Sequence, residues 1–219
     1  MNTTVQDLQR RLIALGYNPG EADGIAGPKT ERAVRVFQIA EGLTVDGVAG
    51  PTTLARLRDK ETKPAASGNA AAVVARQPKA SRSITEIIVH CTATPEGRDV
   101  SVDTIRSWHL ANGWKDIGYH YVVMLDGAIE AGRPEPQVGS HVAGHNTGTL
   151  GIVYVGGVAA DGKTPMDTRT PAQRAALLDL ARALIAKYPT VRKVTGHNQY
   201  AAKACPSFDV RQDDLGRLV

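Results

Sequence analysis

One histidine and one cysteine lie eight residues apart near the C-terminus, in the stretch TGHNQYAAKACPSFD at 195–209. His197 and Cys205 offer an imidazole nitrogen and a thiolate sulfur, the ligand types that zinc favours in proteins. Glycine and proline flank the pair, so we expect a loop in which donor atoms can converge on one ion. A third donor is needed, and His90 of IIVHCTAT is the best candidate. Three protein donors with one open position are typical of a catalytic zinc site.

Each of these residues could also have an ordinary structural role without a metal ion. A histidine in Gly-His-Asn is usually a loop residue, and a single cysteine is usually a small buried hydrophobe. A structural zinc site would need a fourth cysteine or histidine, and Cys91 is the only other cysteine in the chain. Because neighbours on a strand point to opposite faces, we do not expect His90 and Cys91 to bind the same ion. These few residues alone leave the choice open.

Expected strands and helices alternate over residues 83–219. This pattern predicts an α/β fold, with a mixed central sheet flanked by helices that position the donors. Ser101 is the expected N-cap of one helix, and Thr170 with Gln173 forms a capping box at the start of a longer one. His90 and His197 both fall at the ends of expected strands, where sites built on sheets usually gather. Branched residues predict four strands, at 84–90, 119–125, 151–155 and 192–195. Residues 128–132 are expected to pair with the second of these strands as a hairpin.

The first 60 residues contain an internal repeat, DGIAGPKT at 23–30 and DGVAGPTT at 46–53. In each copy Asp-Gly makes a turn, and a proline follows where the first turn of a helix tolerates it. A further helix is expected to begin after Thr4, with Asp7 completing its cap. We therefore predict a small three-helix domain over residues 1–60. Residues 61–82 are rich in Ala, Pro, Ser and Gly, and this composition predicts a flexible linker.

Composition excludes several classes of protein. The net charge is +4, and no basic face interleaved with aromatic residues indicates nucleic-acid binding. No apolar run approaches the roughly 20 residues that span a bilayer, so membrane insertion is not expected. The N-terminal MNTTVQDLQRR lacks an apolar segment of the kind found in secretory signals. Two cysteines make a disulfide framework improbable. We expect a monomer.

Two stretches resemble known families. LQRRLIALGY at 8–17, with the repeated DGxAGPxT turns, is similar to the peptidoglycan-binding type 1 domain of cell-wall hydrolases. IIVHCTATPEG, the GYHYVVMLDG run, GSHVAGHNTG and VTGHNQYAAKACPSFDV resemble the type 2 N-acetylmuramoyl-L-alanine amidases. The likeness runs from about residue 84 to 210 and is strongest to the T7 lysozyme branch. Peptidoglycan-recognition proteins are a further relation.

The resemblance implies zinc (Zn2+) held by His90, His197 and Cys205, with Tyr119 of the GYH motif and Lys203 as catalytic residues. Such an ion lowers the pKa of a bound water to about 7 and polarises a carbonyl. The ammonium of Lys203 would stabilise the oxyanion, and Tyr119 would orient the water or give a proton to the leaving amine. Which of the two donates the proton stays open.

For several other residues the sequence gives a less specific indication of their role. His141 and Asn146 lie in the Gly-rich SHVAGHNTG, and Trp114 could stack on a sugar ring, so we list these three as candidate substrate contacts. Packing inside the domain explains each of them equally well. His120 follows Tyr119 on a strand and is expected to be structural. His109, beside Trp108 on a helix, is expected to be a packed or a surface residue.

The resemblance implies a peptidoglycan hydrolase that cuts the amide between N-acetylmuramic acid and L-alanine, working as a phage or prophage endolysin. Such a protein is made in the host cytoplasm and acts on the cell wall after release. Two alternatives are a non-catalytic peptidoglycan-recognition protein and a cytoplasmic amidase that recycles wall fragments. The first commonly lacks the cysteine ligand, and the second has little use for a wall-binding domain. A contact with an RNA polymerase, known for the T7 branch, is neither supported nor excluded.

Overall fold

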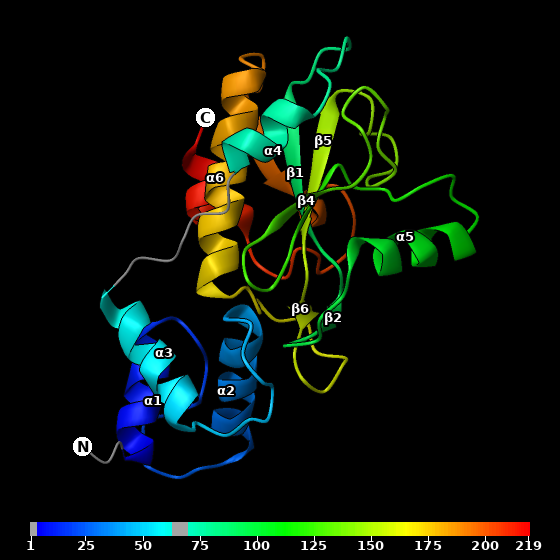
Figure 1. Cartoon of the computed structure of the whole chain (residues 1–219). Helices are drawn as coiled ribbons and strands as arrows, with labels where there is room; N and C mark the ends of the chain where they lie inside the picture. The colour runs from blue at the N-terminus through cyan, green and yellow to red at the C-terminus, as the bar shows by residue number, and fades with distance from the viewer. Residues whose placement is uncertain (1–3, 63–69) are drawn as a thin grey trace.

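The structure is a computed structural model that describes residues 4–62 and 70–219. It has two parts (Figure 1). An N-terminal region holds the helices α1 (Val5–Ala14), α2 (Pro28–Ala40) and α3 (Pro51–Thr62). An α/β region begins at helix α4 (Ala70–Arg76) and continues to the C-terminus. The mixed α/β fold and the small three-helix unit are therefore both confirmed.

Local sequence signals place the N-terminal helices. Thr4 caps α1, and its side chain and that of Asp7 form the predicted capping box. Pro28 and Pro51, the prolines of the two repeats, are the first residues of α2 and α3. The three helices pack around one small core, which consists of Leu8, Leu12, Ala33, Val34, Phe37 and Leu57.

A buried glutamine organises each repeated turn. The amide nitrogen of Gln9 donates to Asp23 Oδ1 at 2.9 Å, and its oxygen accepts the N–H of the following glycine at 2.8 Å. Gln38 makes the same two contacts in the second copy, with Asp46 Oδ1 at 2.7 Å and the next glycine N–H at 2.9 Å. Both glutamines are 1% exposed. Each turn is therefore fixed by an amide that arrives from a preceding helix, α1 or α2.

A five-stranded sheet forms the centre of the α/β region, in the order β4-β3-β5-β1-β7. Strands β3, β5, β1 and β7 run parallel to their neighbours, and β4 pairs with β3 as the antiparallel hairpin partner. This is the predicted mixed sheet. The strands are β1 (Glu86–Cys91), β3 (Tyr121–Val123), β4 (Ile129–Ala131), β5 (Thr149–Tyr154) and β7 (Lys193–Gly196). Two short strands, β2 (Thr94–Pro95) and β6 (Gly157–Val158), pair separately.

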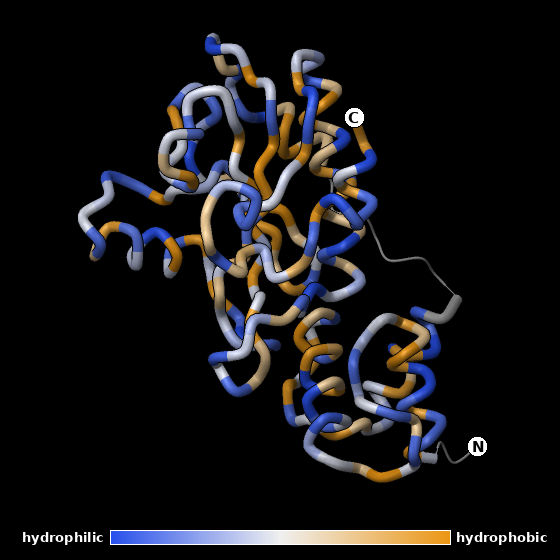
Figure 2. Tube along the Cα trace, turned by 180° about the vertical axis from the view of Figure 1, so that it is seen from behind, coloured by the Kyte–Doolittle hydropathy of each residue, from blue (hydrophilic) through white to orange (hydrophobic). Residues whose placement is uncertain are grey.

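Helices cover both faces of the sheet. The long helix α6 (Pro171–Lys187) lies on one face with α4 beside it, and α5 (Val102–Ala111) lies on the other (Figure 1). Thr170 and Ser101 are the N-caps of α6 and α5, as predicted. Figure 2 shows the hydrophobic residues gathered along the central strands between these layers. Of the helices within residues 4–62 and 70–219, none is long and apolar enough to cross a membrane.

The second half of the expected linker is part of the α/β fold. Ala70 and Val74 of α4 are 4% and 3% exposed and join the core beneath α6. Lys187 Nζ donates to two carbonyls at the end of α4, those of Val74 and Gln77, both at 2.8 Å. The backbone N–H of Ala80 donates to the Tyr188 hydroxyl at 2.7 Å. Of the linker expected over 61–82, residues 61–62 therefore belong to α3 and residues 70–82 to the α/β region, whereas residues 63–69 lie outside the described part.

The two regions touch along α2. Arg32 lies 4.0 Å from the Glu96 carboxylate, just after β2. Partial burial raises the pKa of Glu96 above its ordinary value, and the charge of Arg32 opposes that shift. A Cβ added to Gly97 would lie 2.9 Å from Val36, so the backbone of the α/β region passes very close to α2. The N-terminal region thus contacts the α/β region close to β2 and β6 (Figure 1).

Candidate metal centre and active site

The strand register brings the two histidine donors together. In the parallel pair of β1 and β7, Val89 lies opposite Gly196. The next residues, His90 near the end of β1 and His197 directly after β7, therefore lie side by side at the carboxyl edge of the sheet, and their ring centroids lie 4.7 Å apart. Both predicted positions at strand ends are confirmed.

Cys205 approaches the same point from the C-terminal loop. Its Sγ lies 3.7 Å from His90 Nδ1 and accepts the backbone N–H of Cys91 at 3.3 Å. One donor atom from each of His90, His197 and Cys205 lies within 4.8 Å of the other two. The Cys91 side chain packs in the core beneath α6, on the other face of β1 from His90, as strand alternation predicts, but its thiol still contacts the Cys205 thiol. Within the described residues, this donor cluster has three members.

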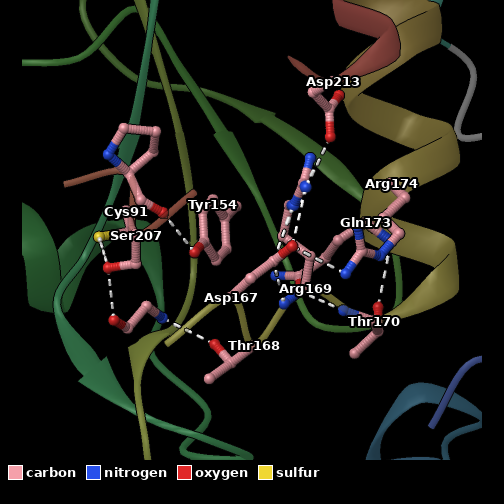
Figure 3. A network of polar contacts seen from close by, with 12 residues as sticks. Cys91, Tyr154, Asp167, Thr168, Arg169, Thr170, Gln173, Arg174, Ser207 and Asp213 are labelled. Atoms are coloured by element: carbon pink, nitrogen blue, oxygen red, sulfur yellow. Dashed lines mark hydrogen bonds and ion pairs between the residues drawn. The ribbon is translucent and has the colours of Figure 1, made fainter. Parts of the chain in front are cut away.

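Hydrogen bonds anchor the loop that carries Cys205 (Figure 3). The hydroxyl of Tyr154 donates to the Pro206 carbonyl at 2.7 Å, directly after the cysteine. The hydroxyl of Ser207 donates to the Gly157 carbonyl at 2.6 Å. Because Tyr154 ends β5 and Gly157 begins β6, the sheet itself holds the loop in place.

A buried arginine packs against the same loop. The side chain of Arg169 is 2% exposed and pairs with the carboxylates of Asp167 and Asp213 at 2.9 and 2.8 Å (Figure 3). Its guanidinium lies over the ring of Phe208, 3.4 Å from the centroid. The charge is therefore paired and hydrogen-bonded, as a buried charge must be. The sequence analysis did not identify this cluster.

The segment that leads to His197 has its own polar support. Glu86 of β1 is 4% exposed and accepts hydrogen bonds from the hydroxyls of Thr195 and Tyr200. Lys193 Nζ lies 3.0 Å from the same carboxylate. These contacts tie the residues on both sides of His197 to β1. A single glutamate at the start of an apolar strand gave no signal of this role in the sequence.

Tyr119 and Lys203 flank the donor cluster. The ring of Tyr119 lies 5.1 Å, centroid to centroid, from the His90 ring. Burial raises the pKa of Tyr119 above its ordinary value, and the nearby thiols of Cys205 and Cys91 add to this shift, so the phenol stays protonated at neutral pH. Lys203 is exposed, on the loop between His197 and Cys205. Burial lowers the pKa of His197, and the positive charge of Lys203 lowers it further.

The environment of His90 favours a neutral ring. Its side chain is fully buried, and burial lowers its pKa well below the ordinary value. Positive charge on His141, His197 or Lys203 would act in the same direction. A neutral imidazole keeps a lone pair free for a metal ion.

His141 and Asn146 both make polar contacts inside the protein. His141 is 7% exposed, and its Nδ1 lies 3.1 Å from His90 Nε2. Its other nitrogen, Nε2, lies 3.3 Å from Thr149 Oγ1. The side-chain oxygen of Asn146 accepts the N–H groups of His141 and Val142, both at 2.9 Å, and so closes the loop. Both ring nitrogens of His141 are used inside the protein, whereas the contacts of Asn146 use only its side-chain oxygen, so its role in substrate binding stays a prediction.

Trp114 remains available at the surface. It is 39% exposed, and its ring lies on that of His109 with centroids 4.4 Å apart. His109 Nδ1 accepts the N–H of Gly118 at 2.9 Å, and its ring lies 5.3 Å from that of Tyr119. His109 is packed, as expected, but it packs against the candidate catalytic tyrosine. Sequence spacing could not reveal that contact.

His120 is structural, as predicted. It is fully buried, its Nδ1 accepts the N–H of Gly151 at 3.0 Å, and its Nε2 lies 3.1 Å from the Gln137 carbonyl. Since Nδ1 is the acceptor, Nε2 carries the proton and donates to that carbonyl. Burial lowers the pKa of His120 to about 4.

The low pKa of His120 predicts a loss of stability in acid. Below pH 6.5 the unfolded chain binds a proton on this residue, whereas the folded chain does so only near pH 4. The free energy of unfolding should therefore fall as the pH drops through this window, by roughly 3 kcal/mol from this group. We expect urea unfolding of metal-free protein to show this slope. His120→Asn keeps an acceptor for Gly151 and should make the slope smaller, although the lowered pKa values of His90 and His141 keep part of it. Equal slopes for both proteins would contradict the assignment.

The N-terminal region has a hollow of its own. It has a volume of about 430 Å³ and lies between the first turn of α1 and the two repeated turns. The rim carries the exposed side chain of Val48, and Glu31 and Asp46 supply negative charge.

The fold and the donor cluster define a class of protein, an α/β domain with three potential metal donors at the carboxyl edge of its sheet. The family model of the N-acetylmuramoyl-L-alanine amidases matches residues 80–208, and that of a peptidoglycan-binding domain matches residues 2–57. The chain belongs to the N-acetylmuramoyl-L-alanine amidase family. It is an amidase of the endolysin type, and it hydrolyses the amide between N-acetylmuramic acid and L-alanine.

Phage endolysins are among its relatives. The endolysin of Klebsiella phage KP32 is 46% identical over 127 residues, which is 58% of this chain and 83% of that protein. The endolysin of Escherichia phage T7 is 43% identical over 134 residues, 61% of this chain and 87% of that protein. The solved structure of an endolysin amidase from Clostridium intestinale matches with 30% identity and a TM-score of 0.51, over 58% of this chain and 78% of that one.

Proposed function

We propose that this amidase is a zinc enzyme, with the ion held by His90, His197 and Cys205. The observation that carries the proposal is the convergence of three donor atoms within 4.8 Å at the carboxyl edge of the sheet. Two imidazoles and one thiolate are a donor set that zinc accepts in catalytic sites, where the fourth position stays open. A bound zinc ion would supply a Lewis acid that activates water and polarises the scissile carbonyl.

Two side chains of this chain supply the remaining chemistry. Tyr119 is a neutral phenol beside His90, and it is placed to orient a water or to give a proton to the leaving amine. Lys203 is a cation on the loop between two of the donors, and it is suited to stabilising negative charge on the carbonyl oxygen. Trp114 offers an exposed ring near Tyr119, on which a sugar of the glycan strand can stack.

We infer that the N-terminal region is a wall-binding domain that ends near residue 60. The match to a peptidoglycan-binding family and the hollow between its repeated turns support this role. A domain that holds the polymer raises the local concentration of the catalytic one at an insoluble substrate. In this reading the protein is made in the host cytoplasm, reaches the wall after release and lyses the cell. The likeness to phage endolysins supports this sequence of events.

The two alternatives from the sequence are less well supported. A peptidoglycan receptor without activity has no need of a complete donor set, and here Cys205 lies in place beside His90. An amidase that recycles soluble fragments has little use for a wall-binding domain.

An end-group assay on purified peptidoglycan, with and without a zinc chelator, tests the proposal. We expect new L-alanine amino groups and no new reducing sugars. Chelation should abolish the reaction, and added zinc should restore it. Activity that persists in protein shown to be metal-free would overturn the zinc assignment, and release of reducing sugars would overturn the bond assignment. Sedimentation with the wall without any cleavage would favour the receptor.

A further inference from the structure

His141 lies directly behind a candidate metal donor. His90 presents Nδ1 to the donor cluster, 3.7 Å from Cys205 Sγ, and its other nitrogen, Nε2, lies 3.1 Å from Nδ1 of His141. The two rings are nearly perpendicular, at 82°, with centroids 5.1 Å apart. One nitrogen of His90 thus faces the site, and the other faces His141.

The proton positions along this chain of contacts follow from simple chemistry. If His90 Nδ1 binds a metal ion, its Nε2 must carry the ring proton and can only donate. His141 Nδ1 must then accept, so His141 carries its proton on Nε2, toward Thr149 Oγ1 at 3.3 Å. The Thr149 hydroxyl donates its own proton to the His145 carbonyl at 2.8 Å, which leaves its oxygen free to accept. The His145 carbonyl can only accept, so it fixes the direction of the hydrogen bonds from His90 through His141 to Thr149.

The fold makes room for an imidazole at this position. A Cβ on Gly139 would lie 2.5 Å from the His141 ring, and one on Gly151 would lie 2.6 Å from it. Distances this short exclude any side chain at either position while the ring is present. His141 is 7% exposed, so water does not compete freely for its nitrogens. The ring is therefore held between two glycines, with both nitrogens in use.

We propose that His141 is a positioning residue, which accepts the Nε2 proton of His90 and so fixes His90 with Nδ1 toward the metal. The inference rests on the zinc site proposed above. Partners of this kind set the orientation and tautomer of a metal-binding histidine, and their loss typically weakens metal binding about 10- to 100-fold. His141 itself touches neither the metal nor the substrate.

A matched pair of substitutions separates positioning from packing. Asparagine and leucine have nearly the same shape, but the asparagine oxygen takes the place of Nδ1 and can still accept from His90. We expect His141→Leu to bind zinc about 10- to 100-fold more weakly than the unmodified full-length protein, and His141→Asn to lie close to it. Zinc affinity is measured by competition with a chromophoric chelator, and the cobalt(II) absorption spectrum reports the donor geometry. Thermal unfolding of the metal-free proteins checks that each variant folds.

The outcomes distinguish this inference from the zinc site itself. Equal zinc affinity for folded His141→Leu and unmodified protein would overturn the positioning role, and so would equal weakening in both variants. An unmodified protein that binds no zinc would overturn the zinc site instead. If His141→Leu does not fold, Thr149→Val provides the second test, because it leaves the His141 ring in place and removes the acceptor beyond it, together with the hydrogen bond to the His145 carbonyl. We then expect a smaller loss of zinc affinity, and an unchanged affinity would count against the inference.

Discussion

Replacing Cys205 with serine is expected to abolish amidase activity and to weaken zinc binding by more than about 100-fold, while the fold persists. A serine hydroxyl does not ionise at neutral pH and is a poor zinc ligand, so the loss should exceed that for residues behind the ligands. The fold should persist because Tyr154 holds the adjacent Pro206 carbonyl and Arg169 holds Phe208, without help from the thiol.

Zinc content after dialysis, and L-alanine end groups released from peptidoglycan, measure the effect of Cys205→Ser. Cys91→Ala is the matched control, because it also removes one thiol, from a side chain that packs beneath α6 and contacts the Cys205 thiol without being a proposed donor. The control should retain zinc and activity. Full activity in a metal-free Cys205→Ser protein would contradict the proposed centre.

The stability of the α/β region on its own should depend on where an N-terminal deletion ends. A protein that begins at residue 63 keeps α4, whereas one that begins at residue 81 loses Ala70, Val74 and Ala80 from the core. Burial of Val74 alone is worth roughly 2 kcal/mol. The shorter protein also leaves Lys187 without the two carbonyls that it caps. We expect the 63–219 protein to fold well and the 81–219 protein to be markedly less stable.

Activity of the 63–219 protein tests the wall-binding role. It should cleave small soluble muropeptides as fast as the full chain, but act on intact sacculi about 10-fold more slowly or worse, because it no longer stays near the polymer. Equal rates on sacculi would reduce the N-terminal region to a spacer. Urea unfolding compares the two shortened proteins, and equal stability would show that α4 contributes nothing.

Local signals in the sequence were sufficient for the fold and for the convergence of the three candidate donors. The capping residues Thr4, Ser101 and Thr170 placed three helix starts, and alternation on β1 separated His90 from Cys91. Branched strands that end in histidine located the carboxyl edge of the sheet. These features depend on residues close in the chain, which is why they could be predicted.

Features that depend on distant contacts could not be predicted in this way. Helix α4 is short and shows no amphipathic period, and only its packing on α6 reveals that it belongs to the fold. The amides of Gln9 and Gln38 resemble any polar residue on a helix until the turns that they hold are seen. The role of His141 depends on which nitrogen of His90 faces it, across 51 residues of sequence.

Gly139 and Gly151 link three positions of the chain in evolution. While an imidazole occupies position 141, neither glycine can acquire a side chain, because the added carbon would lie within 2.6 Å of the ring. A change at 151 is therefore tolerated only together with a smaller residue at 141, and that residue would no longer reach His90. A change at 139 also requires the His120 ring to move, because its Cε1 would lie 2.9 Å from the added carbon. Among related amidases, alanine at 151 should occur with the loss of histidine at 141, and such pairs should mark lineages that orient the residue at position 90 by other means.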